Sequence, residues 1–373
     1  MRDPAEREHE VVLFGATGFT GALTARYLTR NAPDGFRWAI AGRNRSKLER
    51  LRDELGSDVP LLVADASDPE SLRRVAEATR VVATTVGPYI RYGEPLVAAC
   101  AESGTDYCDL TGEPEFVDLM YLRHDARARE TGARLVHCCG FDSIPADLGA
   151  YFTVQQLPEG VPIRLEGFLS IRGRPSGGTV ASMRTIVTRF PQLIGTARRR
   201  RHAEPSPEGR DVRASKGYPH HERAVGGWVV PLPVIDPQIV TRSARALDRY
   251  GPDFTYRHYF AFTGDGSGPS LRSLLRGGLP KPGEGPSAEE RAESWFKMRF
   301  AGEGGGRRVV TEVSGGDPGY DETSKMLGET AMCLARDDLP KRSGQLTTAA
   351  AMGNALIDRL GRAGISFEVL DPA

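Results

Sequence analysis

Between residues 10 and 140, short apolar runs rich in β-branched residues alternate with amphipathic segments of helical periodicity. This alternation constrains the fold more than any other feature of the chain. Strand and helix that follow each other through short links predict a parallel sheet covered by helices on both faces. The expected strands are Val11–Phe14, Arg37–Ala41, Leu61–Ala64, Val81–Val86, Asp106–Leu110 and Arg134–Cys138. The expected helices cover residues 19–31, 46–55, 69–79, 93–103 and 115–131.

Helix-start signals agree with this pattern. Ser46 and Glu49 have the spacing of a capping box, in which the two side chains satisfy each other's backbone N–H groups. Asp68 followed by Pro69 offers a capping side chain and a proline at the first helical position. We therefore expect a doubly wound parallel α/β sheet in the first part of the chain.

The alternation of predicted strands and helices ends after Pro145. Tyrosine- and phenylalanine-bearing segments of alternating polarity predict a second, α+β domain built on a mainly antiparallel sheet, with strands at Leu165–Arg172, Trp228–Val230, Phe254–Thr263 and Arg308–Ser314. Other expected features are helices at 177–202, 320–336 and 344–361, loops at 203–227 and 264–289, and a last strand at Ser366–Leu370. The expected domains are residues 1–145, 146–319 and 320–373.

Composition narrows the class of protein. The 373 residues carry 49 basic and 49 acidic side chains, and a net charge of zero argues against a general attraction to nucleic acid. No run of 18 apolar residues could span a membrane, and the charged stretch Met1–Glu10 has no apolar core of a secretory signal. Five cysteines without a CxxC pair fit a reduced chain, so we expect a cytoplasmic protein.

The glycine-rich turn after the first strand is the sharpest local signal. A GxxGxxG pattern is weak by itself, but here it lies between a predicted strand and a predicted helix. Glycines at such a turn let the chain reverse tightly and let a dinucleotide's diphosphate approach the helix N-terminus. The alternative is a turn that needs glycine only for packing. The candidate cofactor-binding residues are Gly15, Thr17, Gly18, Phe19, Thr20 and Gly21.

The end of the second strand indicates which dinucleotide is bound. About twenty residues after the glycines, an NAD enzyme carries Asp or Glu for the ribose 2′-hydroxyl. This chain has Arg43 and Asn44 there, followed by Arg45 and Lys47, which can pair with a 2′-phosphate. The alternative is a set of ordinary surface bases, although cations are slightly unfavourable at a helix start. We predict NADP(H) as the cofactor.

Further candidate positions follow the third and fourth strands. Asp65 is placed to reach the adenine edge, and Thr85 with Gly87 would approach the nicotinamide ribose. A plain turn is an equally good interpretation of Gly87 and its neighbour Pro88. The segments 106–113 and 139–147 bring acidic and hydroxyl groups to the same sheet edge, where they could orient substrate or transfer protons. Helix capping is the alternative role of these side chains.

These segments together resemble the saccharopine dehydrogenase-like oxidoreductases, and most closely their trans-acting enoyl reductase branch. The resemblance rests on six stretches, GATGFTG (15–21), AGRN (41–44), TTVGPYIRYGEPLVAACAESGTDYCDLTGE (84–113), GFDSIPADLG (140–149), GGTVASM (177–183) and GDPGYDETSKMLGETAMCLA (316–335). It implies a Rossmann-type domain, an inserted α+β domain and a C-terminal segment that returns to the first domain. It also implies reduction by NADPH of a carbon–carbon double bond in a polyketide or lipid intermediate.

Such a reaction needs a donor for the substrate enolate oxygen and a proton source for the α-carbon. The candidate catalytic residues are Tyr89, Tyr107, Asp142 and Ser143. Two other functions stay open: an amino-acid or imine oxidoreductase resembling saccharopine dehydrogenase itself, and a non-catalytic, lipid-associated protein that binds NADP(H).

A basic run, Arg198–Arg201, ends the expected helix at 177–202. It could dock an acyl-carrier domain or rest peripherally on anionic lipid, whereas the plainer interpretation is a solvated helix end that cations favour. His202, His220 and His221 lie in or beside a polar loop without acidic or cysteine ligands at metal spacing, so no metal site is expected.

Overall fold

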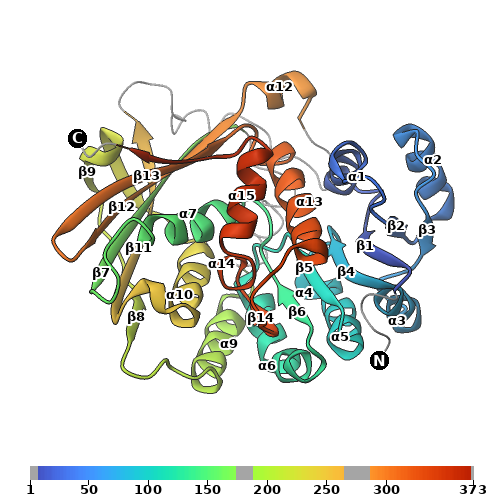
Figure 1. Ribbon diagram of the computed structural model, residues 1–373, viewed down its shortest axis with the longest axis horizontal. Coiled ribbons are helices and arrows are strands. Elements are labelled where there is room, and N and C mark those ends of the chain that lie inside the picture. Colours follow the sequence, from blue (N-terminus) through green and yellow to red (C-terminus); the bar gives the residue numbers. More distant parts are fainter. Residues whose placement is uncertain (1–6, 174–187, 264–285, 371–373) are drawn as a thin grey trace.

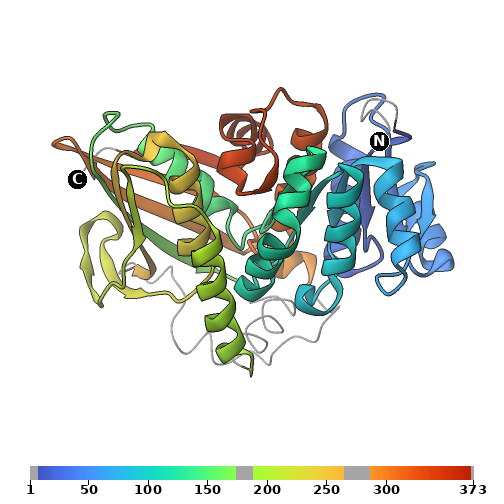
Figure 2. The same cartoon turned by 90° about the horizontal axis from the view of Figure 1, so that it is seen from below.

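The computed structural model describes residues 7–173, 188–263 and 286–370. Two sheets lie side by side along the longest axis of the molecule (Figures 1 and 2). Sheet A has the strand order β14-β6-β5-β4-β1-β2-β3, and every neighbouring pair is parallel. Its strands are β1 (His9–Phe14), β2 (Trp38–Gly42), β3 (Leu61–Val63), β4 (Thr79–Thr84), β5 (Asp106–Asp109), β6 (Arg134–Val136) and β14 (Gly344–Leu346).

Strand β1 shows why sheet A is covered on both faces. Val11 and Leu13 belong to one hydrophobic cluster, whereas Val12 and Phe14 belong to another. Successive strand residues point to opposite faces, so a fully apolar strand requires a helical layer on each side. These layers contain α1 (Phe19–Asn31), α2 (Arg45–Leu55), α3 (Pro69–Ala78), α5 (Glu94–Ser103), α6 (Pro114–Thr131) and α13 (Asp321–Arg336), and the short α4 (Tyr89–Tyr92) precedes α5.

Sheet B is mixed but mainly antiparallel, as expected. Its order is β15-β13-β12-β7-β11-β10-β9, with β8 beside β11, and only the pairs β11–β7 and β11–β8 are parallel within the described ranges. The strands are β7 (Ile163–Arg172), β8 (Asp211–Ala214), β9 (His220–Glu222), β10 (Gly227–Pro231), β11 (Asp253–Thr263), β12 (Trp295–Gly304), β13 (Arg307–Gly315) and β15 (Ser366–Leu370). The fold is therefore a Rossmann-type α/β sheet joined to an α+β unit.

The remaining helices connect the two sheets. Figure 1 shows α13, α14 and α15 between sheet A and sheet B. The C-terminal residues contribute to both sheets, because β14 pairs with β6 and β15 pairs with β13. These connecting elements are α7 (Ile144–Val154), α9 (Phe190–Ala203), α10 (Asp236–Ala246), α12 (Ala288–Ala292), α14 (Thr348–Ala351) and α15 (Asn354–Arg362), with 3₁₀ turns η2 (Arg223–Val225) and η3 (Asp248–Tyr250). The three domain boundaries drawn from the sequence stay a prediction.

Several local expectations are wrong. Asn44, not Ser46, caps α2, because its side chain accepts a hydrogen bond from the backbone N–H of Lys47 at 2.9 Å. The loop expected at 203–227 contains β8, β9 and η2, and the helix expected at 344–361 is split into β14, α14 and α15. Most of the loop expected at 264–289, and residues 177–187 of the expected helix, lie outside the described residues.

Two further observations concern features sought in the sequence. Within the described residues, no helix has both the length and the apolar character needed to cross a bilayer. The same residues contain no group of three or more histidine, cysteine or carboxylate side chains able to hold a metal ion. His220 instead lies 3.6 Å from the Glu222 carboxylate, and His202 contacts the carbonyl oxygen of Arg198.

Candidate active site

The glycine turn between β1 and α1 is tight on its inner side and open at its centre. Gly15 has φ +86°, and a Cβ atom there would lie 2.6 Å from Cγ2 of Val86. A Cβ at Gly21 would overlap the carbonyl oxygen of Gly15, so these two positions require glycine. A Cβ at Gly18 would meet only that same carbonyl oxygen, at 3.4 Å. The space beside Gly18 is therefore available to a ligand.

The N-terminus of α1 suits an anion. Gly18 is the N-cap residue, and neither a side-chain cap nor an acidic residue in the first turn competes for the helix N–H groups. Unpaired N–H groups and the positive end of the helix dipole favour phosphate at such a position. The glycine turn and this uncapped helix therefore fit the diphosphate of a dinucleotide.

Arg43, the predicted partner of a 2′-phosphate, lies at the end of β2. Its side chain is exposed and forms no ion pair with any described residue, whereas Arg45 lies 3.7 Å from Glu49. Asn44 has its side-chain oxygen committed to capping α2. Asp65 accepts hydrogen bonds from Ser67, and these, together with the nearby charge of Arg43, lower the pKa of Asp65. Arg43 and Asp65 thus lie close together at the ends of β2 and β3.

Thr85 and Gly87 follow β4 beside the glycine turn. The hydroxyl of Thr85 donates to the carbonyl oxygen of Gly15 at 3.1 Å, which ties the two loops together. A Cβ at Gly87 would make only ordinary contacts, the nearest with the Tyr89 ring at 3.5 Å. Packing within the chain therefore does not require glycine at position 87, and its cofactor-binding role stays a prediction.

The segment 316–335 brings α13 against the glycine turn. The rings of Phe19 and Tyr320 meet edge to face with centroids 4.8 Å apart. The hydroxyl of Ser324 donates to the carbonyl oxygen of Thr20 at 3.4 Å. Phe19 and Thr20 therefore make contacts within the protein, and α13 forms one wall of the cofactor region.

Both candidate tyrosines are held by strong internal contacts. The Tyr89 hydroxyl donates to the carbonyl oxygen of Thr84 and accepts from the N–H of Leu110, each at 3.1 Å, so it links the ends of β4 and β5. Tyr107 is fully buried and donates to Oδ2 of Asp109 at 3.0 Å. Burial and the charge of Asp109 raise the pKa of both phenols well above the usual range, so both stay neutral.

Asp109 is the centre of a buried polar cluster. Its carboxylate accepts from Tyr107 and from the backbone N–H groups of Thr111 and Cys138 at 3.0 Å, and it lies 2.7 Å from Nδ1 of His137. Asp109 itself is fully buried. These contacts fix the relative positions of the chain segments that follow β5 and β6. The sequence pattern marked Asp109 as a candidate cap but did not reveal its partner His137.

Asp142 lies at this sheet edge, between the segments that follow β5 and β6. Its Oδ1 faces Gly112, where a Cβ atom would come within 3.0 Å of it. Burial, followed by the charge of Asp109, raises the pKa of Asp142 from 3.8 to about 6. A carboxyl group with such a pKa can exchange protons near neutral pH, as a general acid must.

Buried polar groups of the second unit lie near Asp142. The Ser143 side chain is 1% exposed, and its hydroxyl has no hydrogen-bond partner among the described residues. Burial, followed by the charge of Asp142, raises the pKa of Asp236 well above its ordinary value. Oδ2 of Asp236 lies 3.5 Å from Nε2 of His258, and Nδ1 of His258 lies 2.9 Å from the Tyr256 hydroxyl. Burial lowers the pKa of His258 to about 3, so its ring is neutral.

Sequence reasoning did not find Asp236 or His258. Both belong to the second unit, on α10 and β11, and neither sits in a recognisable motif. Asp147 was grouped with the site by its position in 139–147, but its carboxylate is directed elsewhere. It accepts from Thr348 at 2.7 Å and from the N–H of Ala349 at 2.8 Å, and so joins α7 to α14.

Comparison with known proteins agrees with this geometry. Residues 11–136 match the saccharopine dehydrogenase NADP-binding domain. A Mycobacterium tuberculosis protein is 38% identical over 410 residues, and 97% of each chain is covered. A Mycobacterium ulcerans protein named trans-acting enoyl reductase is 37% identical over 413 residues, again covering 97% of each chain. A protein of the same name from Mycobacterium tuberculosis is 37% identical over 416 residues, covering 97% of this chain and 98% of the relative.

A solved structure shares the fold. Apo saccharopine dehydrogenase (L-Glu forming) from Saccharomyces cerevisiae aligns with a TM-score of 0.56 at 12% identity, covering 97% of this chain and all of that one. At this identity the likeness concerns the fold alone. The relatives above match along nearly the whole chain at more than a third identity. The chain therefore belongs to the saccharopine dehydrogenase-like family, in the branch of the trans-acting enoyl reductases, and its first domain binds NADP(H).

Proposed function

We propose that the protein is an NADPH-dependent reductase of the carbon–carbon double bond in an α,β-unsaturated acyl intermediate. The names of relatives that match the whole chain support this proposal. The structural observation that carries it is the pKa of Asp142, raised to about 6, at the edge of sheet A where cofactor and substrate meet. When bound, NADPH supplies the hydride that is added to the β-carbon.

Asp142 is the proposed proton donor to the α-carbon. Its raised pKa leaves a substantial fraction protonated near neutral pH, and its half-buried position keeps it accessible to a substrate. After each turnover the carboxylate of Asp142 takes a proton from solvent, which closes the proton balance of the reaction.

Tyr89 and Tyr107 have a positioning role in this proposal. The Tyr89 hydroxyl is already engaged with Thr84 and Leu110, and that of Tyr107 with Asp109. Glu113 accepts from the backbone N–H groups of Tyr89 and Ile90 at 3.0 and 2.9 Å, which fixes the start of α4. These contacts favour Asp142 over either phenol as the acid.

The substrate class is an acyl thioester, carried either by a small thiol or by an acyl-carrier domain. We place its reactive end between Asp142 and the segment 85–89. Arg198, Arg199 and Arg201 are exposed on α9 and offer positive charge to an acidic carrier. Delivery of the substrate by an acyl-carrier protein extends the main proposal, and a comparison of free and carrier-bound substrates tests it.

The test is NADPH consumption followed by absorbance in single turnover. Crotonyl-CoA is the small substrate, and the same acyl group on an acyl-carrier protein is the carrier substrate. Oxidation of NADPH with either thioester, and its loss in Asp142→Asn, is the expected result. Turnover only with an amino acid and an aldehyde would instead establish the amino-acid oxidoreductase function. Tight NADPH binding without any turnover would contradict the enzymatic proposal.

A further inference from the structure

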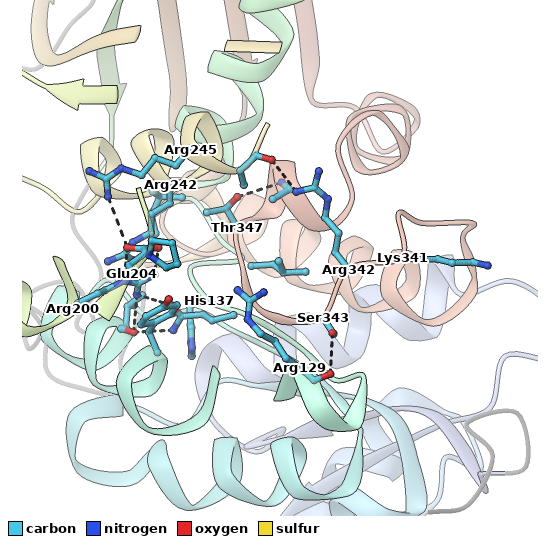
Figure 3. A pocket seen from close by; sticks show the side chains of 18 residues that line it. Arg129, His137, Arg200, Glu204, Arg242, Arg245, Lys341, Arg342, Ser343 and Thr347 are labelled. Carbon is cyan, nitrogen blue, oxygen red and sulfur yellow. Dashed lines mark hydrogen bonds and ion pairs between the residues drawn. The ribbon is translucent and has the colours of Figure 1, made fainter. Parts of the chain in front are cut away.

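A cavity of about 560 Å³ opens between α6, α9, α10 and the segment before α14 (Figure 3). It lies at the β14 edge of sheet A, whereas the glycine turn follows the central strand β1. None of the candidate cofactor-binding residues lines it. Six cationic side chains do, namely Arg129, Arg200, Arg242, Arg245, Lys341 and Arg342. Glu204 is the one carboxylate among the described lining residues.

The carboxylates near the cavity do not balance these cations. Glu204 binds Arg200 through two hydrogen bonds of 3.1 Å and lies 3.8 Å from Arg245. Asp118, behind the wall, contacts Arg200 and Arg242, and Asp125 pairs with Arg129. Lys341 and Arg342 are exposed at the rim and form no ion pair with the described residues. Nη1 of Arg342 donates to the carbonyl oxygen of Ala246 at 2.9 Å. The cavity therefore has a net positive charge.

Two buried polar atoms in the wall have no partner among the described residues. One is Nη1 of Arg242, whose Nη2 binds Asp118. The other is Nε2 of His137, a residue that is 3% exposed and directs Nδ1 to Asp109. Burial and the charge of Arg200 lower the pKa of Arg242 to about 10, so this guanidinium is charged and repelled by its neighbour. Unpaired buried groups of this kind are rare unless a ligand satisfies them.

The cavity also has an apolar side. The guanidinium of Arg200 lies 4.1 Å from the centre of the Tyr121 ring, which holds both side chains in place. Val117, Ile239 and Leu346 add aliphatic surface. Binding sites for organic molecules combine such apolar walls with a few converging polar groups, at volumes of roughly 300–1,000 Å³.

We propose that this cavity is a second ligand site, which binds the phosphate group of an organic phosphate. Arg242 and His137 would contact the phosphate, Arg342 would lie at the rim, and the apolar side would hold the organic part. Lys341, which Figure 3 shows extending away from the cavity, would add positive charge at the entrance. The excess of several positive charges favours a phosphate dianion over a single carboxylate. The basic run that ends α9 thereby has a specific role for Arg200, which is 3% exposed and not part of a solvated surface.

Binding is tested by calorimetry with phenyl phosphate and inorganic phosphate at constant ionic strength, on protein saturated with NADPH. Saturation fills the cofactor site, so any phosphate bound occupies another site. We expect phenyl phosphate to bind more tightly than inorganic phosphate, because only its ring reaches the apolar side. Equal affinities, or no binding of phenyl phosphate, would overturn the proposal.

The variant Lys341→Gln/Arg342→Gln removes two rim charges without leaving any buried carboxylate unpaired. It should weaken phenyl phosphate binding by at least about tenfold, the effect expected for losing charge-assisted contacts. The control Arg73→Gln/Arg74→Gln removes the same charge from the exposed face of α3 and should change the affinity by less than twofold. Equal weakening in both variants would mean nonspecific attraction and would reject the site.

Discussion

The Cα of Gly112 and the carboxylate of Asp142 are so close that a Cβ atom at position 112 would lie 3.0 Å from Oδ1. This contact is tighter than ordinary packing, so Gly112→Ala should displace the Asp142 side chain by a few tenths of an ångström. Misplacement of a reacting group slows chemistry steeply, and we expect a loss of roughly tenfold or more in the single-turnover rate. The NADPH dissociation constant should stay within about twofold, since position 112 lies beyond the glycine turn.

The matched control is Gly361→Ala, at a glycine of α15 with no atom within 4 Å of the added Cβ. It should leave both the rate and NADPH binding unchanged. A full rate in Gly112→Ala would show that the position of Asp142 is not critical and would weaken its assignment as the acid.

With Asp142 as the proposed acid, we predict that the pH dependence of the reaction follows its pKa, which burial raises to about 6. Only the protonated carboxyl can donate, so the protonation rate should be constant below pH 6 and fall about tenfold per unit well above it. Asp142→Asn should be slow at all pH values and lack this limb. Solvent-isotope effects on single turnover, measured from pH 5 to 9, would show whether proton transfer limits the rate. A pH limb near 6 that persists in Asp142→Asn belongs to another group.

The raised pKa of Asp142 also makes the stability of the folded protein depend on pH. Because the folded-state pKa of Asp142 is raised from 3.8, its contribution to the unfolding free energy is fully present below about pH 4 and is lost as the pH rises through 6. Asp142→Asn does not titrate, so it should gain stability relative to the parent protein between pH 4 and 8. The gain is at most about 3 kcal/mol, and less because the carboxyl is only half-buried. Urea unfolding at the two pH values measures it, and a constant difference would contradict the shift.

We predict that cofactor preference depends on Arg43, the proposed partner of the 2′-phosphate. Arg43→Gln removes its charge and should weaken NADPH binding about 10- to 100-fold, the range for hydrogen bonds to charged groups. NADH lacks that phosphate, so its affinity should change little. The control Arg45→Gln removes a cation from the same turn that already lies beside Glu49. Fluorescence titration of both nucleotides checks the prediction, and equal losses for NADPH and NADH would contradict it.

Sheet A could be predicted because its signals are local. Residues such as Val11–Phe14 are apolar throughout, and α3 begins at the capping residue Asp68 and at Pro69. The apolar pattern and the helix-start residues therefore indicate the same element boundaries. The second unit was harder to predict. The sequence of strand β12 (Trp295–Gly304) alternates only weakly between polar and apolar residues. The strand is stabilised by its long pairings with β7 and β13. The choice of Asn44 over Ser46 as the α2 cap was missed because neighbouring polar residues compete for that role.

The candidate site also contains residues that local sequence signals indicate and residues that only tertiary packing brings together. Gly15–Gly21 follow β1 directly and Arg43 follows β2 directly, so both could be proposed from local sequence signals, and their cofactor-binding roles stay predictions. Asp236 lies near Asp142 and His258 because α10 packs against both α7 and β11, and no sequence spacing indicates these contacts. Asp147 shows the opposite error, since an acidic residue near a strand end was attributed to the site although tertiary packing turns it toward α14.

Asp147 should therefore matter for stability. Its carboxylate is fully buried and accepts hydrogen bonds from Ser243, Thr348 and Ala349, which join α7, α10 and α14. Asp147→Ala would leave the Thr348 hydroxyl and the Ala349 N–H without this buried acceptor, whereas Ser243 keeps its contact with the Thr347 hydroxyl, and the cost should be about 2–5 kcal/mol. The control Asp358→Ala, at an exposed position on α15, should change the unfolding free energy by less than about 0.5 kcal/mol. Urea unfolding of both variants provides the measurement. Equal stability would mean that the three donors find other partners, and that the junction of the two sheets does not depend on this carboxylate.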